Sequence, residues 1–173
     1  MDTYVYPETD ILKNIPGIKD KDDLANFELT ATSARVFELL SKPLKGKFDF
    51  AHYKAYHKHI FQDVYPWAGK TRTVNMSKDG EIDFAFVPYI DPEASKVFAD
   101  IKERRIIKIR DRDQIIVELA KFMGNVNVLH PFREGNTRTL QTFVDHLARQ
   151  CKFKMNYSTQ FCKNMGMEFP ASS

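Results

Sequence analysis

Cysteine is scarce in this chain, and long apolar runs are missing from it. The two cysteines among its 173 residues, Cys151 and Cys162, have neither the Cys-x-x-Cys spacing of a metal site nor the density of a secreted disulfide scaffold. No apolar run approaches the roughly 18 residues of a membrane span, and the start, Met1-Asp2-Thr3-Tyr4, lacks the basic segment of a signal peptide. We therefore expect reduced thiols, a cytoplasmic location and no membrane span.

A strong excess of either charge is also missing. The net charge is +3, and acidic residues interrupt the basic run within positions 102–112, so that a solvated helix end is a better interpretation than a nucleic-acid surface. Internal repeats and low-complexity linkers are absent from the sequence. With 43% hydrophobic residues, the chain has the composition of a soluble globular protein. We expect one domain, residues 1–173, and no nucleic-acid partner.

The chain does contain one dense group of chemically active side chains, in residues 130–138. These residues lie between two apolar patterns with helical spacing. The first pattern consists of Ile115, Ile116, Leu119, Phe122, Met123, Val126 and Leu129, and the second of Leu140, Phe143, Val144, Leu147 and Ala148. The spacing predicts that His130 lies at the end of one helix and that Gly135 and Asn136 form a tight turn that opens the next.

Such a turn is suited to binding an anion. The first N–H groups of a helix have no partner within the helix and carry about half a positive charge, and Gly135 permits close approach of a phosphate. Arg138 adds a planar fork of donors for phosphate oxygens. Glu134 is a suitable ligand for Mg²⁺, which usually shares its oxygen ligands with substrate phosphates. His130 remains as the group that takes a proton from an attacking hydroxyl.

This segment, His130-Pro131-Phe132-Arg133-Glu134-Gly135-Asn136-Thr137-Arg138, resembles the signature of the Fic family, His-x-Phe-x-Asp/Glu-Gly-Asn-Gly-Arg-x-x-Arg. Two further segments, Tyr4-Val5-Tyr6-Pro7 and Val64-Tyr65-Pro66-Trp67-Ala68-Gly69-Lys70-Thr71-Arg72, also look like family segments. The resemblance thus covers roughly the whole chain. It is greatest to the Fic domains of bacterial type IV secretion effectors and related toxins, which implies a compact, mainly all-α bundle with one small β-hairpin flap.

The resemblance implies that the chain is a protein adenylyltransferase, a nucleotidyltransferase that moves AMP from Mg-ATP to a Ser, Thr or Tyr hydroxyl of a target protein. His130 is then the catalytic base, Glu134 the Mg²⁺ ligand and Arg138 the group that stabilises the leaving pyrophosphate. Asn136 and the N–H groups of the turn orient the α-phosphate. The nucleotide-binding residues expected on this basis are Arg72, Thr73, Val74 and Asn75 in the hairpin, and Arg133, Glu134, Gly135, Asn136, Thr137, Arg138 and Thr139 in the signature.

Two positions depart from the family signature. Thr137 replaces its second glycine and Gln141 its second arginine. A β-branched residue crowds the loop, and the missing guanidinium removes a phosphate contact of about 1.5–3 kcal/mol. Two alternatives therefore stay open: a catalytically weak or inactive Fic scaffold, and a transferase of another group such as UMP or phosphocholine. A Doc-type kinase is disfavoured, since its loop has Ala-Asn-Lys where this chain has Gly135-Asn136-Thr137.

Fic proteins are typically restrained by a helix that bears Ser/Thr-x-x-x-Glu-Gly/Asn. The only Ser/Thr-x-x-x-Glu match here, Ser77 to Glu81, falls in the predicted hairpin. We therefore expect any restraint to come from a separate, small antitoxin-like protein, whose glutamate Gln141 would meet through a hydrogen bond. The likeness to effectors also implies delivery into a host cell by a secretion system.

Local signals predict the remaining elements. Residues 20–40 form a first helix, and Asp49 caps a second whose buried face includes His57, whereas His52 and His59 lie on the surface. The hairpin is predicted from a strand over 71–75, a turn at Asp79-Gly80 and a strand over 82–86. Further signals predict a helix start at Asp91-Pro92, a cap at Asp113 and a last helix over 158–165.

Overall fold

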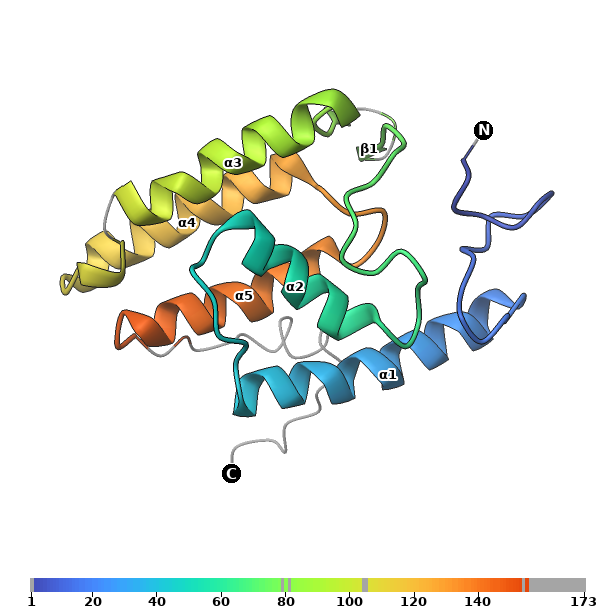
Figure 1. Ribbon diagram of the computed structural model, residues 1–173, viewed down its shortest axis with the longest axis horizontal. Coiled ribbons are helices and arrows are strands. Elements are labelled where there is room, and N and C mark those ends of the chain that lie inside the picture. The colour runs from blue at the N-terminus through green and yellow to red at the C-terminus, as the bar shows by residue number, and fades with distance from the viewer. Residues whose placement is uncertain (1, 79, 81, 104–105, 154, 156–173) are drawn as a thin grey trace.

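The computed structural model describes residues 2–78, 80, 82–103, 106–153 and 155. This part of the chain is mainly helical, with one antiparallel pair of short strands (Figure 1). The helices are α1 (Lys21–Ser41), α2 (Phe50–Phe61), α3 (Val87–Glu103), α4 (Arg112–Leu129) and α5 (Asn136–Gln150); the strands are β1 (Ser77–Lys78) and β2 (Ile82–Asp83), and η1 (Ile106–Lys108) is a 3₁₀ turn. The expected helical bundle with one hairpin is confirmed.

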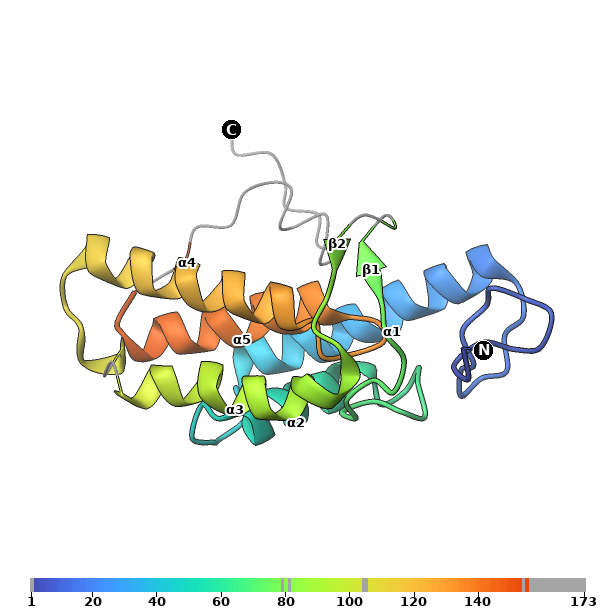
Figure 2. The same ribbon diagram turned by 90° about the horizontal axis from the view of Figure 1, so that it is seen from above.

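The helices are arranged so that the end of α4 and the hairpin meet. In Figure 1, α3 and α4 run side by side along one edge of the bundle, α1 lies along the opposite edge, and α2 and α5 lie between them. Figure 2 shows β1 and β2 projecting from the bundle at the end where α4 gives way to α5. The loop that joins these two helices, residues 130–135, therefore lies beside the hairpin segment.

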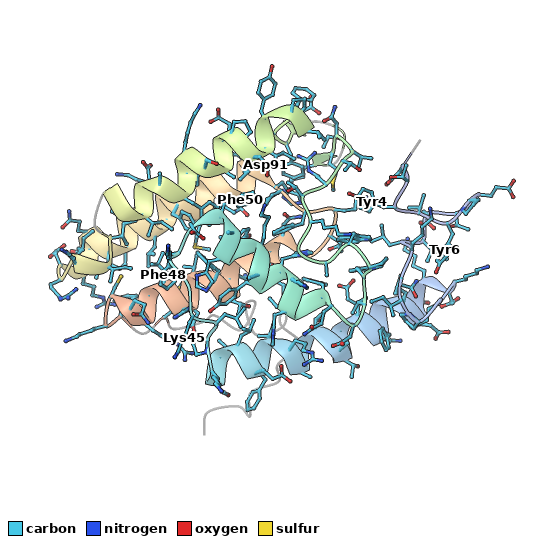
Figure 3. The ribbon with its side chains drawn as sticks, in the orientation of Figure 1. Tyr4, Tyr6, Lys45, Phe48, Phe50 and Asp91 are labelled. Carbon is cyan, nitrogen blue, oxygen red and sulfur yellow. The ribbon has the colours of Figure 1, made fainter. Side chains whose placement is uncertain are left out.

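Aromatic side chains form the centre of the core. The ring of Tyr53 on α2 lies 5.5 Å from that of Phe132, 5.2 Å from Phe143 and 5.1 Å from Phe98, measured between centroids. Figure 3 shows Phe50, which stacks on Tyr53, at the start of α2. Phe132 belongs to the loop between α4 and α5 and is fully buried. The loop is thus anchored in the core by its own side chain.

Local caps explain where several helices begin. Asp20 accepts hydrogen bonds from the N–H groups of Asp22 and Asp23, and Asp49 accepts one from His52, so both predicted starts are confirmed. The predicted cap at Asp113 is wrong. Asp111 caps α4 by accepting from the N–H of Gln114, and Asp113 lies inside the first turn.

The predicted start of α3 is also wrong, because a distant residue caps the helix. The helix begins at Val87, whose N–H donates to Oδ1 of Asn75 at 3.0 Å. Asp91 and Pro92 consequently lie within the helix; Asp91 is labelled in Figure 3. Pro92 lacks the N–H that would bond the carbonyl one turn earlier, so the early start forgoes one helical hydrogen bond.

Three other predictions from sequence need correction or fall outside the structure. Residues 71–75 form no strand, since the first strand is β1, and the second covers only Ile82–Asp83. His52 is buried instead of exposed, with Nε2 2.9 Å from the Leu44 carbonyl, while His59 is half-buried against Glu38. The predicted helix over 158–165 lies outside the described residues. Within the described part of the chain, no helix has the length and apolar character needed to cross a membrane.

Candidate active site

His130 ends α4 in a left-handed conformation that turns the chain out of the helix. Its φ is 43°, and its N–H donates to the Val126 carbonyl at 2.9 Å. The imidazole stacks on Phe84, which follows β2, with the ring centroids 3.8 Å apart and the planes 12° apart. Burial, together with the nearby positive charge of Arg72, lowers the pKa of His130 to about 4. The ring is therefore neutral at pH 7 and able to accept a proton.

Arg72 ties the hairpin segment to this loop. Its Nε donates to the His130 carbonyl at 2.8 Å and its Nη1 to the Val74 carbonyl at 2.6 Å, and Nη2 donates to the Ala85 carbonyl. The Arg72 backbone N–H donates to Pro131 at 2.9 Å. The residue is only 1% exposed, and burial lowers its pKa. Predicted to contact nucleotide, Arg72 lies inside the protein with its guanidinium on backbone carbonyls.

Two side chains hold the loop between α4 and α5 in shape. The amide of Asn136 donates to the Phe132 carbonyl at 2.8 Å and accepts from the Phe132 N–H at 2.9 Å. From α2, Nε2 of His57 donates to the Glu134 carbonyl at 3.0 Å, because its Nδ1 accepts the Gly69 N–H. Burial lowers the pKa of His57 to about 4. His57 is the satisfied core histidine that its position on α2 predicts.

Gly135 completes the turn before α5, as predicted. Its φ of 78° lies in the left-handed region, and a Cβ at this position would lie 2.1 Å from Cζ of Phe61. Only glycine accepts both the conformation and the aromatic ring behind it. The close packing of Phe61 brings the start of α5 against α2.

A cavity of about 370 Å³ lies in front of this turn. It is lined by Met76, His130 and every residue from Arg133 to Arg138. A neighbouring hollow of about 480 Å³ shares Met76 and Arg133 and is otherwise lined by Asp2, Val74, Asn75 and Ser77. The structure thus brings together most of the predicted nucleotide-binding residues.

The other predicted nucleotide-binding residues line neither hollow. Besides Arg72, these are Thr73 and Thr139. The backbone N–H of Thr73 donates to the hydroxyl of Tyr4 at 3.1 Å; Figure 3 labels Tyr4 on the N-terminal arm, facing the bundle. Thr139 is fully buried and donates to the Gly135 carbonyl at 2.8 Å. Of the residues predicted to bind nucleotide, most therefore line the two hollows, whereas Arg72, Thr73 and Thr139 support the loops around them.

Glu134 places one carboxylate at the cavity. Its Oε1 accepts the Gly135 N–H at 2.9 Å. Although the residue as a whole is exposed, the loop crowds the carboxyl group, and this desolvation raises the pKa of Glu134. Among the described residues, no three His, Cys, Asp or Glu side chains come together as metal ligands. A carboxylate such as that of Glu134 suits a cation that takes most of its ligands from a substrate and water.

Arg138 lies in the first turn of α5 and is held by α1. Its Nη1 donates to Oε1 of Glu28 at 3.1 Å and to the hydroxyl of Thr32 at 2.7 Å. The guanidinium also lies 5.5 Å from the centre of the Phe61 ring. Sequence reasoning missed Glu28 and Thr32, which precede Arg138 by 110 and 106 residues.

Two further contacts at the cavity were not predicted. Arg133 pairs with Asp2 through Nη2 at 2.7 Å and Nε at 3.0 Å. Phe84 covers one face of His130, as described above. The alternation after Asp79-Gly80 indicated a strand over Phe84, but no local pattern indicates which ring it will meet.

The two departures from the family signature differ in their surroundings. Thr137 is exposed on the cavity wall within α5, and it is absent from the residues with positive φ. Its β-branched side chain therefore occupies space at the cavity without straining the backbone. Gln141 is half-buried, and its Oε1 is buried without a hydrogen-bond partner in the described part of the chain.

Comparisons with known proteins place this arrangement in a family. A model of the Fic/DOC family matches residues 47–148. The chain is 38% identical over 156 residues to the protein adenylyltransferase VbhT of Bartonella schoenbuchensis, a match that covers 90% of this chain and 32% of VbhT. It is 37% identical over 158 residues to the probable protein adenylyltransferase y4lH of Sinorhizobium fredii, with 91% and 80% covered.

Solved structures of Fic domains have the same fold as this chain. The N-terminal Fic domain of a VirB-translocated effector protein from Bartonella sp. AR 15-3 matches with a TM-score of 0.82 and 25% identity, over 91% of this chain and 77% of that one. The fold and the signature loop define a Fic domain, and the chain belongs to the Fic/DOC family. It spans about a third of the length of VbhT and most of the length of y4lH.

Proposed function

We propose that the protein is a protein adenylyltransferase that transfers AMP from ATP to a Ser, Thr or Tyr hydroxyl of a target protein. The observation that carries the proposal is a neutral imidazole, His130, at the rim of a cavity whose wall is the N-terminus of a helix that bears Arg138. The naming of both relatives as adenylyltransferases or probable ones supports it.

The chain's own residues account for the chemistry of such a transfer. The target hydroxyl attacks the α-phosphorus while its proton passes to a nitrogen of His130, and the bond from the α-phosphorus to the pyrophosphate oxygen breaks. The N-terminus of α5 stabilises the negative charge on the α-phosphate, and Arg138 the charge on the leaving pyrophosphate. Asn136 contributes indirectly, because its side-chain amide donates to the Phe132 carbonyl and accepts from the Phe132 N–H, and so holds the loop in shape.

Mg²⁺ fits this site as a cation shared with the substrate. Glu134 would hold it, because its carboxyl lines the cavity and because a nearby cation would offset the desolvation that raises its pKa. A single protein carboxylate is enough for Mg²⁺ that is otherwise bound by phosphates and water. When bound, Mg²⁺ would neutralise the charge of the phosphate chain.

The neighbouring hollow and the hairpin supply places for the nucleoside and the target. We call the cavity in front of the turn before α5 the phosphate cavity. The hollow beside Val74 and Asn75 shares Met76 and Arg133 with the phosphate cavity, so we assign the nucleoside to this hollow. Ser77 and Lys78 of β1 are exposed, and we assign the alignment of the target segment to this hairpin by strand addition.

The partners beyond ATP and the location follow from the same proposal. A small antitoxin-like protein would restrain the enzyme through a glutamate whose carboxylate accepts a hydrogen bond from the side-chain amide N–H of Gln141. One solved relative is described as a VirB-translocated effector. We therefore propose that this protein is made in the cytoplasm and delivered into a host cell by a secretion system.

A second candidate function is transfer of another nucleotide-derived group, such as UMP or phosphocholine. Thr137 and Gln141 favour it, because both change the residues near the phosphates relative to the signature. An inactive Fic scaffold is the third possibility, and it rests on the same two residues.

One experiment separates these functions. The protein is incubated with target lysate and with labelled ATP, CTP, UTP or CDP-choline, beside a His130→Asn variant that keeps a residue suited to positive φ. The proposal expects label from ATP alone, in wild type and not in the variant. Label from a different donor would support the second function. The absence of label from every donor would support the scaffold.

A further inference from the structure

A carboxylate in the middle of α1 reaches the guanidinium of Arg138. Oε1 of Glu28 lies 3.1 Å from Nη1 of Arg138, and both side chains are largely buried, at 15% and 18% exposed. Oε2 of Glu28 accepts the hydroxyl of Tyr65. Each carboxylate oxygen therefore has a donor of its own, and the ion pair is compensated as a buried pair requires.

Thr32, one turn after Glu28 on α1, completes the arrangement. Its hydroxyl accepts from Nη1 of Arg138 at 2.7 Å and donates to the Glu28 carbonyl at 2.7 Å. Burial, and next to it the charge of Glu28, raises the pKa of Tyr65, so that its hydroxyl stays protonated and keeps donating. We call Glu28, Thr32 and Tyr65 the α1 clamp.

The α1 clamp holds only part of the guanidinium. Nη1 of Arg138 carries both clamp contacts, whereas its Nε is buried with no hydrogen-bond partner in the described part of the chain. Arg138 nevertheless lines the phosphate cavity, and the clamp residues do not. The α1 clamp therefore contacts Arg138 from outside the cavity.

We propose that the α1 clamp is a positioning device that aims Arg138 at the phosphates beyond the α-phosphate, with Glu28 as its principal residue. This proposal rests on the proposed function, because it takes a nucleoside triphosphate as the ligand. A long, flexible side chain binds phosphate well when its planar fork is fixed beforehand, since less conformational entropy is then lost on binding. Tyr65 fixes Glu28, and Glu28 with Thr32 fixes Arg138.

The opposite role, in which Glu28 restrains Arg138, predicts an effect of the opposite sign. Removing a negative charge near the cavity makes its potential more positive, so that electrostatics alone would tighten ATP binding in Glu28→Gln. Positioning predicts weaker binding of ATP and little effect on AMP, which lacks the phosphates that Arg138 serves. The sign of the change therefore decides between the two roles.

The test is calorimetric titration of the full chain with ATP and with AMP. The variants are Glu28→Gln and Tyr65→Phe, and the matched control is Glu38→Gln, on the same helix and paired with Arg35 at the surface. We expect about tenfold weaker ATP binding in Glu28→Gln, a smaller loss in the same direction in Tyr65→Phe, and AMP binding within about twofold of wild type. Glu38→Gln should bind both nucleotides as wild type does.

A double mutant shows whether Glu28 acts through Arg138. In the background of Arg138→Gln, the change Glu28→Gln should no longer alter ATP binding. Unchanged or tighter ATP binding in Glu28→Gln, or a loss that persists without Arg138, overturns the proposal. If Glu28→Gln does not fold by circular dichroism, Tyr65→Phe decides by the same ATP-to-AMP comparison.

These binding measurements do not depend on the transfer reaction. Differential loss of ATP binding combined with no transfer of label from any donor would refute the proposed function and leave the clamp standing. Transfer of label from ATP, combined with unchanged ATP binding in both clamp variants, would refute the clamp and leave the proposed function standing.

Discussion

Gly135 offers a sharp test of how the loop is packed, through Gly135→Ala. The substitution meets two obstacles, the left-handed φ of 78° and the ring of Phe61 2.1 Å from the new Cβ. Phe61 is fully buried, so the ring has little room to withdraw. Gly17 is the matched control, because its φ is 75° and a Cβ there would have no atom within 4 Å.

The two positions separate the backbone term from the packing term. A left-handed conformation costs an L-residue about 1–2 kcal/mol, and the lower entropy of the unfolded chain returns about 0.4–1 kcal/mol, so Gly17→Ala should lose about 1 kcal/mol. Forcing a methyl group into a packed core costs about a further 1–3 kcal/mol. Gly135→Ala should therefore lose about 2–4 kcal/mol of unfolding free energy.

Urea denaturation of the two variants measures this difference, and Phe61→Leu supplies the check. In the Phe61→Leu background the aromatic ring is gone, and Gly135→Ala should cost about 1 kcal/mol, the backbone term alone. Equal losses for Gly17→Ala and Gly135→Ala would refute the argument. So would a loss at Gly135 that Phe61→Leu leaves unchanged, since the ring would then not be the obstacle.

Three further predictions concern the chemistry. His130→Asn should abolish transfer and leave ATP affinity within about twofold of wild type; labelling by the variant at the wild-type rate would contradict the role of base. Thr137→Gly with Gln141→Arg should tighten ATP binding by about tenfold or more, the value of one charged hydrogen bond, and unchanged affinity in titration would show that these positions do not limit the site. Because the pKa of His130 is lowered to about 4, the rate should not fall with an apparent pKa near 6.5 as pH decreases; stopped assays on folded protein between pH 5 and 8 would show such a fall if the ring were an ordinary histidine.

The starts of α1 and α2 were predictable from their local caps. Asp49 accepts from the N–H of His52, three residues on, at 2.8 Å, so the signal and the bond fall in the same short segment. The start of α3 was not predictable in this way, because its cap is Asn75, twelve residues before Val87. Asp91-Pro92 is a typical sequence for a helix start, but the helix begins four residues earlier because folding brings Asn75 to the N–H of Val87.

The hairpin was predictable as an element and not in its register. Residues 71–75 were predicted to form the first strand, but the guanidinium of Arg72 donates to the carbonyls of His130 and Ala85, and its backbone N–H donates to the carbonyl of Pro131. Local sequence signals indicate that a segment is extended. It does not show whether the partner of that segment is a strand or a loop.

His52 shows the limit of an argument from one helical face. The apolar stripe of α2 placed it at the surface, yet the segment before α2 folds over it, with the Phe48 N–H 3.3 Å from Nδ1 and the Leu44 carbonyl at Nε2. A helix that is covered on two sides buries residues that a single stripe leaves out. The signature residues were easier to predict, because they are contiguous and need no distant partner to be noticed.

Because Gln141 stands in place of the second signature arginine, the contacts that fix Arg138 become more important. Two cations of the described residues line the phosphate cavity, Arg133 and Arg138, and Arg133 is paired with Asp2 at the rim. Gln141, one turn after Arg138, brings a buried amide oxygen without a partner where a guanidinium would have carried charge. Under the proposed function, Arg138 meets the phosphate charge with little help from a neighbouring cation, so that an error in its orientation is not compensated. We therefore expect the residues of α1 that fix Arg138 to affect nucleotide binding more than they would in a loop with two signature arginines.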